Sequence, residues 1–142
     1  MTAPTVQVYS AMHTRLTGFA ALTALLASSS AVYSHVEQGA TKPYVSFGAG
    51  DDWLRWNTKT DRGWRVRIQV DVWTEKRGPK TAYDIIEQIV AALQDAGETW
   101  LNDNLTGYHA VSFEFLDQDV IRDPDGVTFH GFVNFDLLLE TA

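Results

Sequence analysis

The stretch from Trp64 to Leu93 constrains the fold of this chain more than any other. Its first part, Trp64–Thr74, has apolar residues at the even positions up to Val72 and polar residues at the odd positions up to Asp71. A period of two places these two sets on opposite faces of a β-strand. Apolar residues then recur at steps of three and four, as in one stripe of a helix, at Ala82, Ile85, Ile86, Ile89, Val90 and Leu93. Strand and helix each have one apolar side, so we expect the helix to dock on a sheet.

The boundaries of this helix also carry sequence signals. The preceding segment, Glu75–Lys80, is charged and contains Gly78-Pro79, which predicts a loop. Thr81 with Asp84 three residues later predicts an N-cap followed by an acidic first turn. Gly97 stands where a left-handed residue commonly ends a helix.

The remaining chain predicts a second helix and further strands. Alanine-rich sequence from about Val6 or Tyr9 to Ala27 carries an apolar stripe that indicates a helix. An irregular crossing segment over residues 31–43 is followed by a short strand, Tyr44–Gly48. Alternating runs follow at Val111–Phe115, with a bulge expected at a register change after Leu116, and at Val127–Leu137.

The turn between these last two runs is the clearest local signal. In Asp123-Pro124-Asp125-Gly126, proline presets φ for a type I turn and glycine supplies the left-handed residue that follows it. The order of elements predicts an α+β fold, a two-layer sandwich in which an antiparallel-rich β-sheet has two α-helices packed on one face.

Length and composition narrow the possible functions. The 142 residues predict a single domain over 1–142, and a net charge of −7 argues against a protein that mainly binds nucleic acid. Without cysteine the chain has no disulfide or thiolate metal site. No apolar run reaches the roughly eighteen residues of a membrane span. The apolar stretch from Leu16 to Ala31 fits an amphipathic helix better than a cleaved signal peptide, because positive charge before it is sparse and Thr17, Gly18 and Thr23 interrupt it.

A search for catalytic motifs finds none. The chain has no phosphate-binding glycine loop, no His-Glu-x-x-His and no Gly-x-Ser-x-Gly, and its histidines are scattered without ligand spacing. His130 is expected on the polar face of its strand, as a surface or interface residue rather than a general base. Acidic residues near the last turn suggest either a solvated hairpin tip or, less in keeping with cation-loop patterns, a metal site. We therefore expect no catalytic residue, cofactor or metal ligand.

The stretch Gly48–Gly63 leaves two interpretations open, because Trp53 and Trp56 stand there among charges and glycines. The aromatic rings fold back onto the core, or they form an exposed arm that anchors another chain, since tryptophan and arginine are favoured at interfaces. A basic knot at Lys76, Arg77 and Lys80 is likewise either a solvated loop or a contact with an acidic patch of a neighbouring subunit.

Several segments together resemble one known family. The segments Val32–Ala40 and Pro43–Gly48, the block Val70–Gly78 with the helix after it, and the turn Asp123–Gly126 with His130-Gly131 resemble the tail completion (tail terminator) proteins of long-tailed phages and gene transfer agents. The resemblance extends from about Met12 to Leu139. The Gly48–Gly63 stretch and the segment from Trp100 to Tyr108 have no clear counterpart in the family pattern.

The resemblance implies a structural role in a virion, at the head-proximal end of the tail, after assembly in the host cytoplasm. Such proteins form hexameric rings that stop polymerisation of the tail tube protein and present a surface to the head-tail connector or stopper. DNA passes through the lumen without specific binding, which suits an acidic chain. The candidate interface residues are Trp53, Leu54, Trp56, Arg65, Arg67, Lys76, Arg77, Lys80 and His130.

Other functions stay open on the sequence alone. A head-side stopper or adaptor and a tail tube subunit are the structural alternatives. A small-molecule binding module would use the polar face of the sheet, with Trp73 and His130 lining it. If the exposed arm is correct, replacing Trp53 and Trp56 with alanine would leave the fold intact and weaken capping of the tube.

Overall fold

Six β-strands form one sheet within the described part of the chain. The computed structural model describes residues 2–142, except 35, 37, 49, 76 and 77. The strands β1, β2, β4, β6 and β5 lie side by side in this order. Strand β3 also pairs with β4, on the same edge as β2. Their bounds are β1 Val32–Tyr33, β2 Tyr44–Phe47, β3 Asp52–Asn57, β4 Arg62–Thr74, β5 Tyr108–Arg122 and β6 Phe129–Thr141. Every pairing is antiparallel except that of β1 with β2.

Strand β4 is the centre of the sheet and has two partners along one of its edges. Its first half pairs with β3, from Asn57 opposite Arg62 to Asp52 opposite Arg67. Its second half pairs with β2, where Phe47 lies opposite Val70. The other edge of β4 pairs with β6 along its whole length except the first residue. Among the described strands, β3 therefore pairs only with the N-terminal half of β4.

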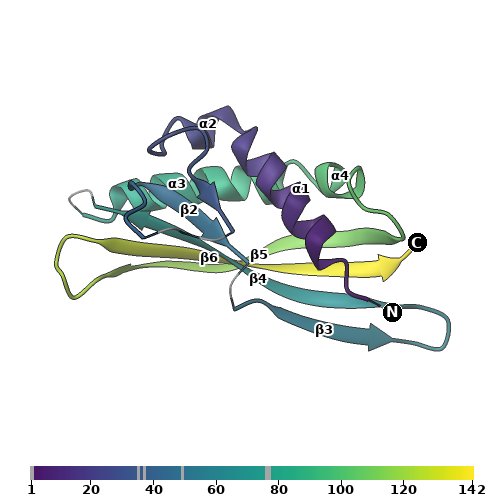
Figure 1. Ribbon diagram of the computed structural model, residues 1–142. Coiled ribbons are helices and arrows are strands. Elements are labelled where there is room, and N and C mark those ends of the chain that lie inside the picture. The colour runs from purple at the N-terminus through teal and green to yellow at the C-terminus, as the bar shows by residue number, and fades with distance from the viewer. Residues whose placement is uncertain (1, 35, 37, 49, 76–77) are drawn as a thin grey trace.

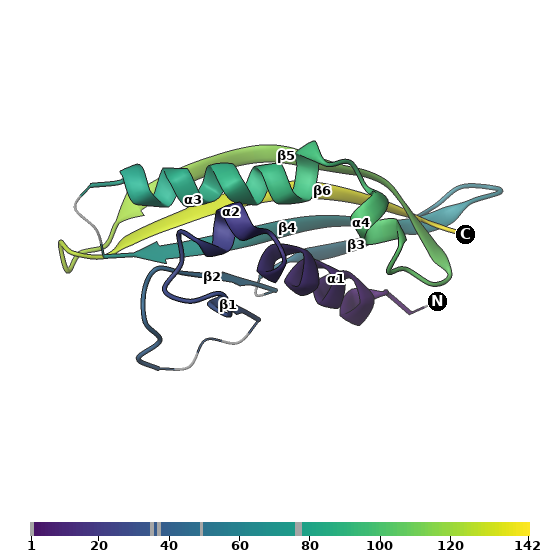
Figure 2. The same ribbon diagram turned by 90° about the horizontal axis from the view of Figure 1, so that it is seen from above.

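The helices lie on one face of the sheet (Figures 1 and 2). They are α1 Thr5–Thr17, α2 Ala20–Thr23, α3 Lys80–Val90 and α4 Thr99–Asn102, and α3 continues into the π-helical turn η1 Ala91–Asp95. The two long helices, α1 and α3, provide most of the cover, so the predicted two-layer α+β sandwich is confirmed. Among the described residues, no helix is long and apolar enough to cross a membrane.

The core lies between α3, α1 and the inner face of β4 and β6. The predicted stripe of α3 is fully buried at Ala82, Ile85, Ile86, Ile89 and Leu93, and the even positions of β4 from Val66 to Val72 face it, also fully buried. Each large side chain buried in this way contributes roughly 1.5–3 kcal/mol, as an upper bound. The outer face of the sheet has no helix over it in the described structure (Figure 1).

Two predicted helix boundaries are wrong. The N-terminal helix does not continue to Ala27, because α1 ends at Thr17 and Phe19 takes an extended conformation with ψ 96° before α2 begins. Glycine is a poor helix former, and the break at Gly18 lets Leu22 and Leu26 turn into the core. Helix α3 begins at Lys80 with Pro79 before it, so Thr81 is not its N-cap. Proline suits this place because the first helical N–H groups have no partner.

The predicted features of the C-terminal half are largely confirmed. Gly97 has φ +76°, as a left-handed helix stop requires. The register between β5 and β6 shifts between Phe115 and Asp117, which places the expected bulge at Leu116. A backbone bond from Gly126 N to Asp123 O closes the predicted turn. The predicted run Val127–Leu137 begins too early, however, because Val127 lies before β6 and is exposed.

Candidate assembly surface

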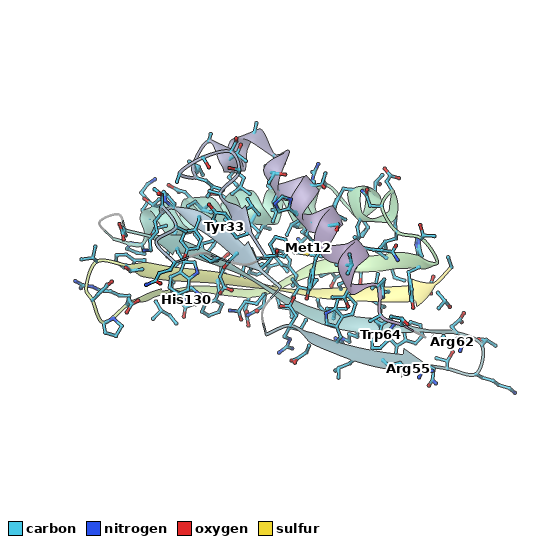
Figure 3. The ribbon with its side chains drawn as sticks, viewed as in Figure 1. Met12, Tyr33, Arg55, Arg62, Trp64 and His130 are labelled. Atoms are coloured by element: carbon cyan, nitrogen blue, oxygen red, sulfur yellow. The ribbon has the colours of Figure 1, made fainter. Side chains whose placement is uncertain are left out.

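The β3–β4 hairpin, residues 52–67, extends along the sheet at the end opposite the β5–β6 turn (Figure 1). Its two strands are joined by the polar segment Thr58–Asp61, where Thr58 N donates to Asp61 O and Asp61 N donates to Thr58 Oγ1. Residues 54, 55 and 57–62 are exposed, and Arg55 and Arg62 lie at the far part of the hairpin (Figure 3). We call this element the basic hairpin, because it carries five basic and two acidic residues, a net charge of +3.

Trp53 lies on the helix side of the basic hairpin and packs against the core. Its indole meets the rings of Tyr9 and Trp64 edge to face, at centroid distances of 6.2 and 6.3 Å. Its Nε1 donates a hydrogen bond to the Tyr9 hydroxyl at 3.3 Å. For this ring the structure matches the interpretation in which the aromatic side chain folds back.

Trp56 reaches across the sheet on the other side. Its Nε1 donates to the main-chain oxygen of Leu139 in β6 at 3.1 Å, although β4 lies between the two strands. Gly63 is the residue of β4 that pairs with Trp56 and, on its other edge, with Glu140. A Cβ at Gly63 would lie 1.8 Å from the oxygen of Leu139. The missing side chain at Gly63 therefore allows the close strand approach and leaves room for the indole.

Asp51 anchors the basic hairpin where β4 changes partners. Its Oδ1 accepts the backbone N–H of Gln69 at 3.0 Å, and its Oδ2 accepts the Tyr9 hydroxyl at 2.6 Å. Gln69 lies between Arg67 and Val70, the last residues that pair with β3 and β2. The carboxylate therefore satisfies a donor at the gap between the two edge strands.

Burial governs the protonation of this anchor. It raises the pKa of Asp51 above its ordinary value, although the hydrogen bonds from Gln69 and Tyr9 offset part of the effect. Burial and the bond to Asp51 also raise the pKa of Tyr9 to about 12. Neither Tyr9 nor Asp51 is among the interface residues expected from the sequence. No local pattern could have paired them, because their contact spans 42 positions of the chain.

The candidate residues Arg65 and Arg67 lie on the outer face of β4 and are exposed. Arg65 already has an intramolecular partner, because its Nε and Nη2 donate to the two carboxylate oxygens of Asp136 at 3.2 and 2.9 Å. That paired carboxylate raises the pKa of Arg65 further. Leu54 lies directly opposite Arg65 on the same face, and 64% of it is exposed. Leu54 is thus the most exposed hydrophobic residue of the basic hairpin.

His130 belongs to a polar cluster at the other half of the outer face. Its ring stacks on Trp73 with a centroid distance of 4.0 Å and an angle of 2° between the planes. Its Nε2 lies 2.7 Å from Oδ1 of Asp71, which also accepts the Gln69 amide at 2.8 Å. The predicted placement of His130 on the polar face is therefore correct.

Of the three residues of the basic knot, the structure describes only Lys80. Lys76 and Arg77 lie outside the described residues. Lys80 is exposed and donates to Asp84 at 2.7 Å, one turn further along α3, and this partner raises the pKa of Lys80. The structure therefore brings together Trp53, Leu54, Trp56, Arg65 and Arg67 on the hairpin and β4, whereas Lys80 and His130 lie elsewhere.

The opposite edge of the sheet is acidic. Strand β5 has no partner on its outer edge among the described strands, and its residues Glu114–Asp119 are all exposed. Together β5, β6 and their turn, residues 108–141, carry seven acidic residues and one arginine, a net charge of −6. We call residues 114–121 of β5, all of which are exposed except the half-buried Val120, the acidic edge.

The turn between β5 and β6 is stabilised by one carboxylate. Asp125 accepts hydrogen bonds from the hydroxyl of Thr128 at 2.7 Å and from the backbone N–H groups of Thr128 and Val127 at 2.8 Å. These bonds lower the pKa of Asp125 to about 2. The arrangement matches the interpretation of a solvated hairpin tip. Within the described residues, no three acidic or histidine side chains converge as a cation site requires.

Comparisons with known proteins identify the family of this chain. No curated protein matches the sequence. A solved structure described as the virion of a native gene transfer agent particle contains a chain that is 26% identical and superposes with a TM-score of 0.77. The alignment covers 97% of this chain and 95% of that one. The family model described as tail completion protein gp17 matches residues 10–140. The chain therefore belongs to the tail completion protein gp17 family and is a structural protein of a virion tail.

Proposed function

We propose that this protein forms a closed ring at the head-proximal end of the tail, ends the polymerisation of the tail tube and joins the tail to the head. The match over 97% of this chain to a chain of a gene transfer agent virion carries this proposal, together with the tail completion family to which the chain belongs. Two features support it: the outer face of the sheet has no helix over it in the described structure (Figure 1), and residues 54, 55 and 57–62 of the basic hairpin are exposed.

A ring needs two different surfaces on each copy. Contacts between unlike surfaces repeat from copy to copy and close when the rotation between neighbours divides a full turn. The basic hairpin and the acidic edge are two such surfaces on one molecule. Six copies are the number that the family resemblance implies. The net charge of −7 suits a lumen that DNA passes without being held.

Assembly of purified tail tube protein with and without this protein tests the proposal. We expect tubes of limited length with a ring at one end, and negative-stain electron microscopy measures both. Light scattering after size exclusion gives the number of copies from the protomer mass of 15.9 kDa. If tube length and tube ends are unchanged by an excess of the protein, the proposal fails.

The same experiment addresses the alternatives. A tail tube subunit would polymerise alone into long cylinders. A head-side stopper or adaptor would bind head connectors and leave free tubes unchanged.

Leu54→Ser is the sharpest probe of the hairpin in this assay, because 64% of Leu54 is exposed. Replacing Trp53 and Trp56 is a less specific probe of the surface, because it would also remove the hydrogen bonds from Trp53 to Tyr9 and from Trp56 to Leu139.

A further inference from the structure

The surface charges of this protein are divided between two opposite edges of its sheet. The basic hairpin carries a net charge of +3, and the β5–β6 unit carries −6. Strand order places them apart, with β3 on one side of β4 and with β6 and then β5 on the other. One copy cannot bring its own hairpin to its own acidic edge, because the paired strands β4 and β6 lie between them.

Arg65 of the basic hairpin pairs with Asp136 of β6, whereas other charges on both edges have no ion-pair partner within the described chain. No acidic side chain there forms an ion pair with Arg55, Lys59 or Arg62, and no basic side chain pairs with Glu114 or Asp119. Exposed apolar side chains accompany both sets. Leu54 lies on the hairpin, and the acidic edge exposes Phe115, Leu116 and Ile121. Apolar residues next to charges of opposite sign on two surfaces are typical of complementary interfaces.

The helix side of the acidic edge adds to its charge. There α3, η1 and β5 border an open groove of about 390 Å³ with Val90 and Phe115 among its apolar lining. Glu87 and Asp95 also line it, and no lysine or arginine is among its described lining residues. Negative charge therefore faces both sides of the β5 edge.

We propose that the basic hairpin of one copy docks on the acidic edge of the next copy, and that this contact links the ring. The inference rests on the proposed ring and names the surfaces that build it. Contacts between two hairpins or between two acidic edges would bring like charges together, so the charges favour unlike surfaces. A chain of unlike contacts is the arrangement that can close into a ring.

Two charge-reversed variants test this assignment. The first, R55E/K59E/R62E, has an acidic hairpin, and the second, E114K/D119K, has a basic β5 edge. Each alone would place like charges at every contact, so we expect each to lose assembly and remain monomeric in light scattering. Asp117 is left unchanged because it accepts a hydrogen bond from Asn134. Circular dichroism and thermal unfolding check that both variants fold.

The two variants serve as controls for one another. In an equimolar mixture the acidic hairpin of one meets the basic edge of the other, so we expect rings in which the two variants alternate, with equal numbers of each by native mass spectrometry. A single chain carrying all five substitutions should assemble with itself. Rings from either folded variant alone, or a mixture that stays monomeric, would overturn the inference.

The outcomes also separate this inference from the proposed function. If the wild-type protein caps tubes as rings and both reversed variants do so equally, the hairpin and acidic-edge assignment is wrong while the function stands. If the wild-type protein neither self-associates nor occupies tube ends, the proposed ring and this contact fail together.

Discussion

The two hairpins of this protein are held in different ways. The β5–β6 turn is stabilised by Asp125 through bonds to residues two and three positions along the chain. The basic hairpin depends on distant partners, because Asp51 bonds to Tyr9 across 42 positions and Trp56 bonds to Leu139 across 83. One hairpin is therefore shaped by its own sequence and the other by the body of the protein.

The carboxylates that hold the two hairpins, Asp125 and Asp51, also differ in pKa. The exposed Asp125 accepts three hydrogen bonds, and these lower its pKa to about 2. Asp51 lies partly buried under α1, and burial raises its pKa. A locally formed turn can use a well-hydrated charge, whereas an anchor between layers must remove its charge from water. Substitutions at the basic hairpin should accordingly affect contacts far along the chain.

The largest expected effect is at Gly63. Gly63→Ala places a Cβ against the backbone oxygen of Leu139, which cannot move without shifting β6. We expect the free energy of unfolding to fall by about 3 kcal/mol. Gly131→Ala is the matched control in the same sheet, because its Cβ would meet the end of the Ile86 side chain at 3.2 Å. Urea unfolding compares the two, and equal losses would contradict the close approach at Gly63.

Tyr9→Phe removes the hydroxyl that donates to Asp51 and should cost about 1–2 kcal/mol at pH 7. A raised pKa in the folded state means that Asp51 favours folding most when it is protonated, below its ordinary value of 3.8, and that this contribution is lost as pH rises through the folded pKa. Losing the Tyr9 donor raises that pKa further. In urea unfolding, the difference in the free energy of unfolding between the variant and wild type should therefore be smaller at pH 4 than at pH 7. Tyr83→Phe, whose hydroxyl has no described hydrogen bond, should change little at either pH.

Trp56→Phe tests the second long-range bond of the hairpin. Loss of the hydrogen bond to Leu139 should lower the free energy of unfolding by about 1 kcal/mol. Amide hydrogen exchange should accelerate in β3 and leave α3 unchanged. Trp100→Phe removes a similar bond, from Nε1 to Leu93 O at 3.2 Å, within the helical layer. If both variants accelerate exchange in the same segments, Trp56 does not hold β3 specifically.

The smallest effect concerns the local turn. Thr128→Val removes the hydroxyl donor to Asp125, so the pKa of Asp125 should rise from about 2 toward 3.8. A lowered pKa stabilises the folded state above pH 3.8, and this contribution is lost as pH falls through about 2. Between pH 5 and pH 2, the free energy of unfolding of the variant should therefore change less than that of wild type. An NMR titration of Asp125 measures the shift, and an unchanged pKa would contradict this role of Thr128.

Sequence patterns anticipated most of the fold and part of the candidate surface. The alternation in β4, the stripe of α3, the bulge at Leu116 and the turn at Asp123–Gly126 are periodic or local features, and the structure confirms them. The end of α1 and the start of α3 were missed, because a helix boundary depends on a few residues whose weak preferences packing can override. In the Gly48–Gly63 stretch, local sequence does not determine the positions of Trp53 and Trp56, because both rings are held by partners outside the stretch.

By itself, the sequence determined the two layers, the buried stripes and the tight β5–β6 turn, because hydrophobic periodicity and turn chemistry act over a few neighbouring residues. Only the tertiary structure decided that β3 and β2 share one edge of β4, that Asp51 fills the gap between them, and that the basic hairpin and the acidic edge lie on opposite sides of the sheet. These features depend on which strands become neighbours, and that choice is made when the whole apolar surface is buried at once.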